Sequence, residues 1–310
     1  MVSVARRCDR RVSVHGWLIL DKPLGLGSTQ GVSAVKRALR NGGYGKAKVG
    51  HGGTLDPLAT GVLPIAIGEA TKLAGRMLDS DKVYDFTIRF GEQTDTLDRE
   101  GAVIATSDIR PTAAALAAVL ARFTGPIAQV PPAYSALKVD GQRAYDLARA
   151  GEDVVLATRD VTVHALDMAG KPDNGALEEA MLSTHVSKGT YIRSLARDIA
   201  LALGTVGHVT YLRRTKAGPF DLAQAITLDK LDEVAKARSL EHFLLPLGAG
   251  LDDIPALALV PDQAGALRQG RVLAGIAADD GQAFAMLDGT PVALVEVEDG
   301  FVRVVRGFNL

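Results

Sequence analysis

The sequence predicts an α+β fold: a mixed, mostly antiparallel sheet with flanking helices, followed by a small, mostly-β domain at the C-terminus. Strand-like segments dominate the chain, and several neighbouring pairs are joined by short turns as in hairpins, whereas βαβ repeats are few. The length of 310 residues, 47% of them hydrophobic, is enough for one large domain and one small one.

Composition excludes several classes of protein. The single cysteine, Cys8, rules out an internal disulfide and any zinc site built from several cysteines. The six histidines show no ligand spacing such as His-x-x-x-His, so we expect no metal site. No apolar run approaches the roughly 18 residues of a membrane span, and residues 1–11 lack the apolar stretch of a signal peptide. We therefore expect a cytoplasmic protein whose residues 1–11 form a disordered basic tail.

Charge is distributed unevenly although the net charge is only -1. Residues 1–48 hold 10 Lys/Arg against 2 Asp, a net of +8, and residues 251–310 hold 4 Arg against 9 Asp/Glu, a net of -5. A basic N-terminal part suits contact with phosphates, and an ordinary solvated basic surface explains the same charge.

The first elements follow from apolar spacing. Residues 16–20 predict a short apolar strand, and Ser28 is suited to cap a helix that carries Val32, Val35 and Leu39 on one face.

The next stretch, residues 50–64, reads G-H-G-G-T-L-D-P-L-A-T-G-V-L-P, and its four glycines argue against a regular helix or strand there. Pro57 fixes its own φ and biases Asp56 away from the helical region. We expect a rigid turn that presents the Asp56 carboxylate near His51, followed after Gly61 by a buried strand. A tight turn with an Asx cap is the structural alternative.

The remaining elements follow from the same kinds of pattern, period 2 for strands and 3.6 for helices. In chain order we expect a helix over 69–78, a half-buried strand over 82–90, a helix from Pro111 to before Gly125, a strand pair over 159–168 and 177–187, a helix from Ile192 ended by Gly204, a linker over 248–255, a helix over 262–269, and strands over 282–288, 291–298 and 301–306.

Residues 50–64 closely resemble the catalytic loop of the TruB family, the bacterial tRNA pseudouridine-55 synthases. D-K-P at 21–23, K-V-Y at 82–84, G-E-Q-T-D-T at 91–96 and the segment 130–151 also match that family's motifs. The resemblance spans about residues 16–220. It implies the pseudouridine synthase fold, no cofactor, and isomerisation of uridine 55 in the T loop of tRNA by base flipping and an aspartate nucleophile.

The resemblance also implies roles for single residues. They are Asp56 as the catalytic nucleophile, Arg193 as its electrostatic partner, Tyr84 stacked on the target base, Leu212 in apolar contact with it, His51 in the space that the flipped base vacates, and Tyr191 as a further substrate contact. Three of these residues also have a purely structural interpretation. Tyr84 would be a core tyrosine at a strand end, Arg193 a surface arginine, and His51 a loop histidine bonded to a backbone carbonyl.

The expected organisation is a catalytic domain over 12–248, with residues 130–151 as an insertion that clamps RNA, and a PUA-like domain over 251–310. The segment 130–151 mixes basic and aromatic residues, which suits single-stranded RNA and also suits an ordinary loop and helix. The resemblance of residues 251–310 to a PUA-like domain is weak. The alternative is a tail that packs on the catalytic domain without touching RNA. The expected partner is the T stem-loop of tRNA, bound by a monomer.

Two rival functions remain open. An aspartyl-phosphate phosphatase would need a second acidic residue two positions after Asp56 to hold Mg²⁺, and Leu58 occupies that position. A non-catalytic RNA-binding or tRNA-folding protein would use the same surface and form no product.

Overall fold

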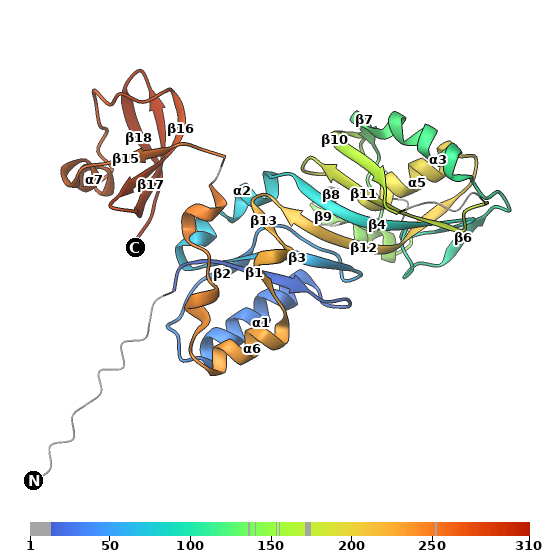
Figure 1. Ribbon diagram of the computed structural model, residues 1–310, viewed down its shortest axis with the longest axis horizontal. Coiled ribbons are helices and arrows are strands. Elements are labelled where there is room, and N and C mark those ends of the chain that lie inside the picture. Colours follow the sequence, from blue (N-terminus) through green and yellow to red (C-terminus); the bar gives the residue numbers. More distant parts are fainter. Residues whose placement is uncertain are drawn as a thin grey trace, which may run out of the picture. The chain divides into compact units, whose positions relative to one another are not determined.

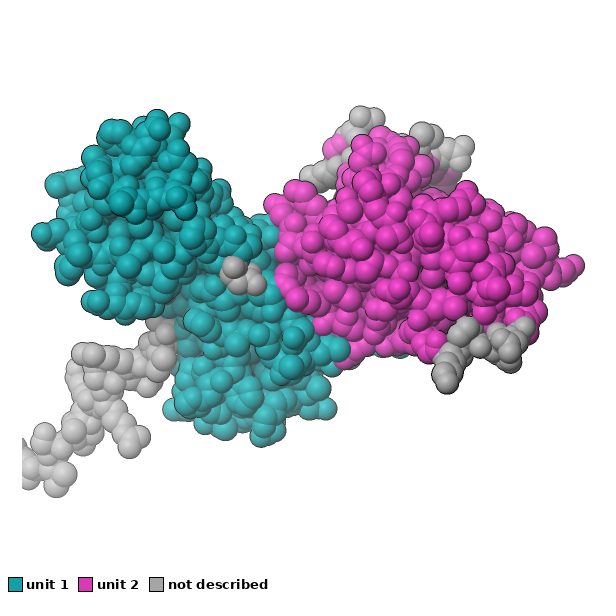
Figure 2. Space-filling model, turned by 45° about the horizontal axis from the view of Figure 1, so that its top comes forward, with its two compact units in different colours: residues 1–57, 62–78, 219–310 teal, residues 58–61, 79–218 magenta. Residues whose placement is uncertain are grey.

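The computed structural model describes residues 14–135, 137–139, 141–152, 154, 156–170, 175–251 and 253–310. The expected basic tail, residues 1–11, lies outside the described residues. The chain divides into two compact units (Figure 2). Unit 1 comprises residues 1–57, 62–78 and 219–310, and unit 2 comprises residues 58–61 and 79–218.

Unit 1 contains a sheet of strands β14, β1 and β3 in that order, with β2 paired to β3 (Figure 1). Strand β1 (Gly16–Lys22) is parallel to β14 (Ala225–Ile226), and β2 (Val49–His51) is antiparallel to β3 (Ala59–Ile67). Residues 62–67 of β3 are buried, as their apolar sequence predicts.

Two helices of unit 1 are amphipathic and pack against each other and against β1. They are α1 (Ser28–Asn41) and α6 (Leu228–Lys236). Figure 1 shows both on one side of this sheet. The expected helix over 69–78 is instead a 3₁₀ turn, η1 (Gly68–Lys72), followed by a short helix, α2 (Ala74–Asp79).

Unit 2 contains the strands β12, β4, β11, β10 and β7 in that order, and residues 59–61 of β3 run parallel to β12. Every pair from β12 to β7 is antiparallel. The bounds are β12 (Gly207–Ala217), β4 (Lys82–Phe90), β11 (Glu179–Val186), β10 (Arg159–Met168) and β7 (Gly125–Gln129).

The core of unit 2 lies between one face of this sheet and two helices, α3 (Ala113–Leu120) and α5 (Ile192–Ala202). Alternate residues of β4, Phe86, Ile88 and Phe90, are fully buried in it, because side chains two positions apart share one face of a strand. The alternation over 82–90 in the sequence predicts this arrangement, and the strand has the expected bounds.

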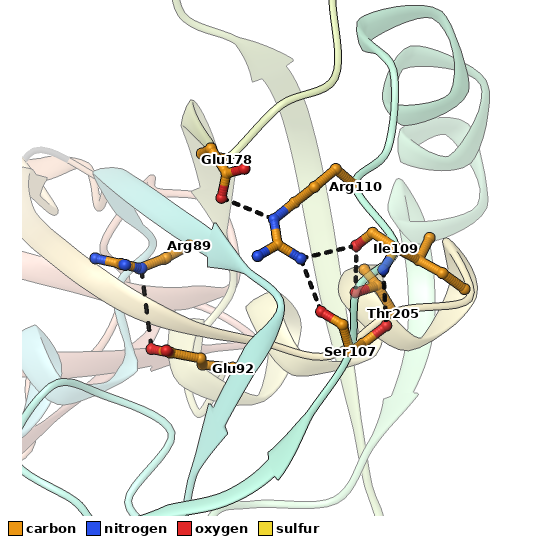
Figure 3. A network of polar contacts seen from close by, with 7 residues as sticks. All are labelled: Arg89, Glu92, Ser107, Ile109, Arg110, Glu178 and Thr205. Atoms are coloured by element: carbon orange, nitrogen blue, oxygen red, sulfur yellow. Dashed lines mark hydrogen bonds and ion pairs between the residues drawn. The ribbon is translucent and has the colours of Figure 1, made fainter.

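A polar network fixes the far end of β4 and the chain that follows it (Figure 3). Arg110 donates to the Glu178 carboxylate at 2.7 Å and to the Ser107 carbonyl at 2.7 Å. The Thr205 hydroxyl donates to the Ile109 carbonyl at 2.9 Å, which connects the segment 107–110 to the end of α5. The segment 91–98 begins beside this network, where the Ser107 amide donates to the Gly91 carbonyl at 2.9 Å.

The C-terminal residues form a four-stranded sheet in the order β15, β16, β17, β18. The strands are β15 (Ala256–Ala258), β16 (Gly281–Leu287), β17 (Thr290–Glu298) and β18 (Phe301–Gly307), and α7 (Pro261–Arg268) packs on them around a small core. The predicted helix and three predicted strands of this region are confirmed to within two residues.

The shorter elements complete the chain. They are β5 (Glu92–Thr94), β6 (Val103–Thr106), η2 (Ala121–Phe123), β8 (Lys138–Val139), β9 (Gln142–Arg143), α4 (Ala144–Arg149), β13 (Phe220–Asp221), η3 (Leu222–Gln224), η4 (Leu240–Phe243) and η5 (Leu247–Gly250).

The predicted fold class, α+β with a mixed, mostly antiparallel sheet and a small C-terminal β domain, is confirmed. The expectation that the glycine-rich stretch up to Gly61 avoids regular structure is wrong at both ends, since Gly50 and His51 belong to β2 and β3 begins at Ala59. Glycine at 61 lets β3 pass close to β12 because a Cβ there would collide with the Arg214 carbonyl oxygen. Among the described residues, no helix has the length and hydropathy to span a bilayer.

Candidate active site

The loop that carries Asp56 leaves β2 of unit 1 through two glycines, Gly52 and Gly53. A Cβ at Gly52 would collide with the side chain of Met77, and Gly53 has φ 140°, a conformation that favours glycine. The Gly52 amide donates to the Pro64 carbonyl of β3 at 2.8 Å, so the chain after the loop runs back beside β2. His51 pairs with Ile65 at the end of β2, and its side chain is half-buried.

A buried serine holds the residue before Asp56. The Ser28 hydroxyl donates to the Leu55 carbonyl at 2.9 Å and accepts from the Leu55 amide at 2.8 Å. Both residues are buried, so these polar groups satisfy each other's hydrogen bonds in place of water. The N-cap of α1 is Gly27, and the expectation that Ser28 caps this helix is wrong.

A buried lysine holds the residue after Asp56. The Lys22 ammonium donates to the carbonyls of Pro57 at 3.3 Å and Leu26 at 2.6 Å, and the Gly25 amide donates to the Pro57 carbonyl at 2.8 Å. An amine withdrawn from water requires such acceptors. Asp56, itself half-buried, is therefore flanked on both sides by residues whose backbone is pinned.

Tyr84 and Leu212 lie on neighbouring strands of unit 2, at the edge of its core. Tyr84 on β4 is paired with Arg214 on β12, and Leu212 is paired with Phe86, two residues further along β4. Tyr84 and Leu212 are both half-exposed and pack against the same core cluster. An aromatic ring and an aliphatic side chain thus stand close together in the sheet with part of their apolar surface uncovered.

Tyr191 and Arg193 begin α5. Tyr191 is the N-cap, and the amide side chain of Gln129 bonds both to its backbone N–H at 2.8 Å and to its carbonyl at 3.1 Å. The buried Arg193 guanidinium donates to the carbonyls of Thr96 at 2.9 Å and Tyr134 at 3.0 Å. The expected alternative of a surface arginine is therefore wrong.

Asp98 is a functional candidate that sequence reasoning missed. Its carboxylate lies 3.5 Å from the Arg193 guanidinium, and the two side chains are only 11% and 8% exposed. The Thr96 hydroxyl at 2.6 Å and the Glu100 amide at 3.1 Å donate to the other carboxylate oxygen. Asp98 comes two positions after the G-E-Q-T-D-T motif, and this proximity is the sequence signal by which it could have been found.

Lys82 is a second buried cation in unit 2, two residues before Tyr84. Burial, reinforced by the positive charge of Arg214, lowers the pKa of Lys82 to about 8. Its ammonium donates to the Ser80 carbonyl. The start of β4 therefore carries a lysine whose charge changes just above neutral pH.

The predicted site residues divide between the units: Asp56 and His51 belong to unit 1, and Tyr84, Tyr191, Arg193 and Leu212 to unit 2. Residues 40–192 match the TruB family pseudouridylate synthase (N terminal domain), and residues 193–252 match the tRNA pseudouridylate synthase B C-terminal domain. The chain belongs to the TruB family.

Relatives named tRNA pseudouridine synthase B match nearly the whole chain. The protein of Novosphingobium aromaticivorans is 66% identical over 96% of this chain and 98% of its own length, and that of Zymomonas mobilis is 60% identical over 96% and 97%. The crystal structure of a Cbf5–Nop10–Gar1 complex has a TM-score of 0.71 at 24% identity, covering 95% of this chain and 85% of that one, which establishes the shared fold.

Proposed function

We propose that this chain converts uridine to pseudouridine in tRNA, at position 55 of the T loop. Membership of the TruB family and the shared name of relatives at 66% and 60% identity support this activity. The observation that carries the proposal at the site is the pinning of Asp56. Ser28 and Lys22, both buried, hold Leu55 and Pro57 on either side of it.

The reaction breaks the N1–C1′ bond of uridine and forms a C5–C1′ bond, while C5 loses a proton and N1 gains one. No electrons are transferred to an acceptor, so the chemistry can proceed with protein groups alone. Asp56 is the nucleophile or base that starts it, since a carboxylate can attack carbon or accept a proton. Attack at C1′, attack at C6 and formation of a glycal after C2′ deprotonation all use this carboxylate.

The target base must leave the RNA stack to reach a protein carboxylate. Tyr84 provides a half-exposed ring for stacking, worth ~1–3 kcal/mol per base, and Leu212 provides apolar contact from the next strand. His51 fills the space left in the RNA, and Tyr191 contacts the substrate from the start of α5.

Arg193 is the electrostatic partner of Asp56 in this mechanism. A guanidinium is permanently charged and offers planar donors that suit a carboxylate. The carbonyls of Thr96 and Tyr134 and the carboxylate of Asp98 hold its planar head in one orientation. Asp98 is therefore a positioning residue, which aims the Arg193 head without touching the substrate.

The same proposal assigns residues 12–248 to catalysis, residues 251–310 to a PUA-like RNA-binding domain, and residues 130–151 to clamping the RNA. The clamp has an anchor at its start, because Ser194 and Arg197 of α5 donate to the Val130 carbonyl at 2.8 and 3.2 Å. We propose that the protein acts as a monomer in the bacterial cytoplasm.

The Asp56→Asn variant tests the proposal. Asparagine has nearly the same shape, so the loop should fold, but it cannot act as nucleophile or base. Pseudouridine formation on a T stem-loop should fall below detection while RNA affinity changes little, because phosphate contacts and stacking lie elsewhere. Near-normal turnover would refute the catalytic assignment. Binding of the stem-loop without turnover by the unmutated chain would instead favour the non-catalytic RNA-folding function.

A further inference from the structure

Three metal-ligating side chains meet on the surface of unit 2, apart from the residues assigned to catalysis. They are Asp81, which precedes β4, His164 on β10 and His185 on β11. One carboxylate oxygen of Asp81 lies 3.2 Å from His164 Nε2 and 3.6 Å from His185 Nε2. The three ligand atoms all lie within 4.8 Å of one another.

The sheet brings these residues together through an irregularity in β10. Val163 is paired with Val186, but the next partner of β11, His185, is paired with Ala165, so His164 is the extra residue of a β-bulge. Bulges turn a side chain away from its regular direction. The two imidazoles consequently lie side by side, with ring centroids 4.7 Å apart.

The third ligand comes from the next strand over. His185 is paired with Val83 of β4, and Asp81 stands two residues before Val83. A diagonal neighbour at this separation is within reach of a long side chain across a sheet. Two neighbouring strands and the residue just before a third therefore supply one ligand each, which is a preorganised arrangement.

The two separations between the Asp81 oxygen and the imidazole nitrogens match a tetrahedral metal ion. With zinc bonds of about 2.0–2.1 Å, the edge of the tetrahedron is about 3.3 Å. The two measured edges, 3.2 and 3.6 Å, lie on either side of this value. Two imidazoles with one carboxylate are ligands that suit Zn²⁺ and its neighbours in the first transition row, whereas Mg²⁺ and Ca²⁺ prefer oxygen alone.

We propose that Asp81, His164 and His185 bind one divalent transition-metal ion, such as Zn²⁺, and leave its fourth position to water. The side chains are 48%, 37% and 43% exposed, which gives the ion a path from solvent. The ion would cross-link the start of β4 to β10 and β11, and this binding is independent of the proposed function.

The test is zinc uptake by the full chain after treatment with EDTA and dialysis. Calorimetric titration should show one Zn²⁺ bound per chain, excess Mg²⁺ should not compete, and Co²⁺ should give the visible absorption of a tetrahedral site. Added Zn²⁺ should raise the melting temperature, because it binds the folded state alone.

The variants His185→Gln and Asp81→Asn should each weaken zinc binding by at least about tenfold and abolish the melting shift. His242→Gln, at an exposed histidine of η4, is the matched control and should bind like the unmutated chain. Exposed His164 gives a third variant if either substitution disturbs folding. The proposal would be overturned if the chain took up no stoichiometric zinc, or if a His164→Gln/His185→Gln double variant took up as much as the unmutated chain. The three side chains would then form only polar contacts between one carboxylate and two imidazoles.

Discussion

Replacing Ser28 by alanine tests the link between loop anchoring and catalysis. The change removes both hydrogen bonds between the serine hydroxyl and the backbone of Leu55, measured at 2.9 and 2.8 Å. The Leu55 amide and carbonyl then lose this partner inside the protein, since both residues are buried. Each unsatisfied buried group costs about 1–3 kcal/mol, so the two together predict a loss of ~2–6 kcal/mol in the free energy of unfolding.

The catalytic effect should exceed the effect on RNA binding. Leu55 precedes Asp56 directly, and a displacement of about 1 Å in a catalytic group can cost ~10²-fold in rate. Single-turnover pseudouridine formation on a T stem-loop should therefore slow by ~10²-fold, while the Kd for the same RNA stays within about threefold.

A matched control separates anchoring from helix effects. Ser33→Ala removes an exposed hydroxyl from the same helix. That hydroxyl donates to the Thr29 carbonyl at 3.0 Å, and its loss should leave rate and stability unchanged. Urea unfolding of both variants gives the stability difference. If Ser28→Ala matched Ser33→Ala in both rate and stability, the inference that Ser28 positions Asp56 would be refuted.

Three further predictions concern other parts of the molecule. The pKa of Lys82 is about 8 in the folded chain and 10.5 when unfolded, so the unfolded chain binds more protons between these pH values. The free energy of unfolding should therefore rise by about 3 kcal/mol from pH 8 to 10.5. Urea titrations of Lys82→Met should not show this rise. Tyr84→Phe should retain most of the turnover if the ring only stacks, or lose ~10²–10⁴-fold if its hydroxyl moves a proton, whereas an unaffected Tyr84→Ala would place it outside the site. Deleting residues 251–310 should weaken binding of whole tRNA modestly and spare turnover of a stem-loop; a folded truncation without that turnover would contradict a separate domain.

The local pattern of apolar and polar residues was sufficient to predict most strands. Over residues 82–90 the apolar and polar side chains alternate, and the strand has the predicted bounds because one face lies on the core and the other does not. The pattern was insufficient over 69–78, where apolar spacing predicts one helix and the chain forms a 3₁₀ turn and a shorter helix. A hydroxyl near a helix start is an equally ambiguous signal, since Ser28 bonds Leu55 instead of capping α1.

The sequence by itself determined the fold class, the family and the identity of the candidate catalytic loop, because alternation, apolar periodicity and the G-G-T-L-D-P motif are all local. Only the tertiary structure decided which distant groups hold these residues. Asp98 lies beside Arg193, 95 positions away in the chain, and His164 lies beside Asp81 and His185 through a bulge. Such pairings depend on strand register and side-chain direction, which follow from how the strands pack together, and no spacing along the chain encodes them.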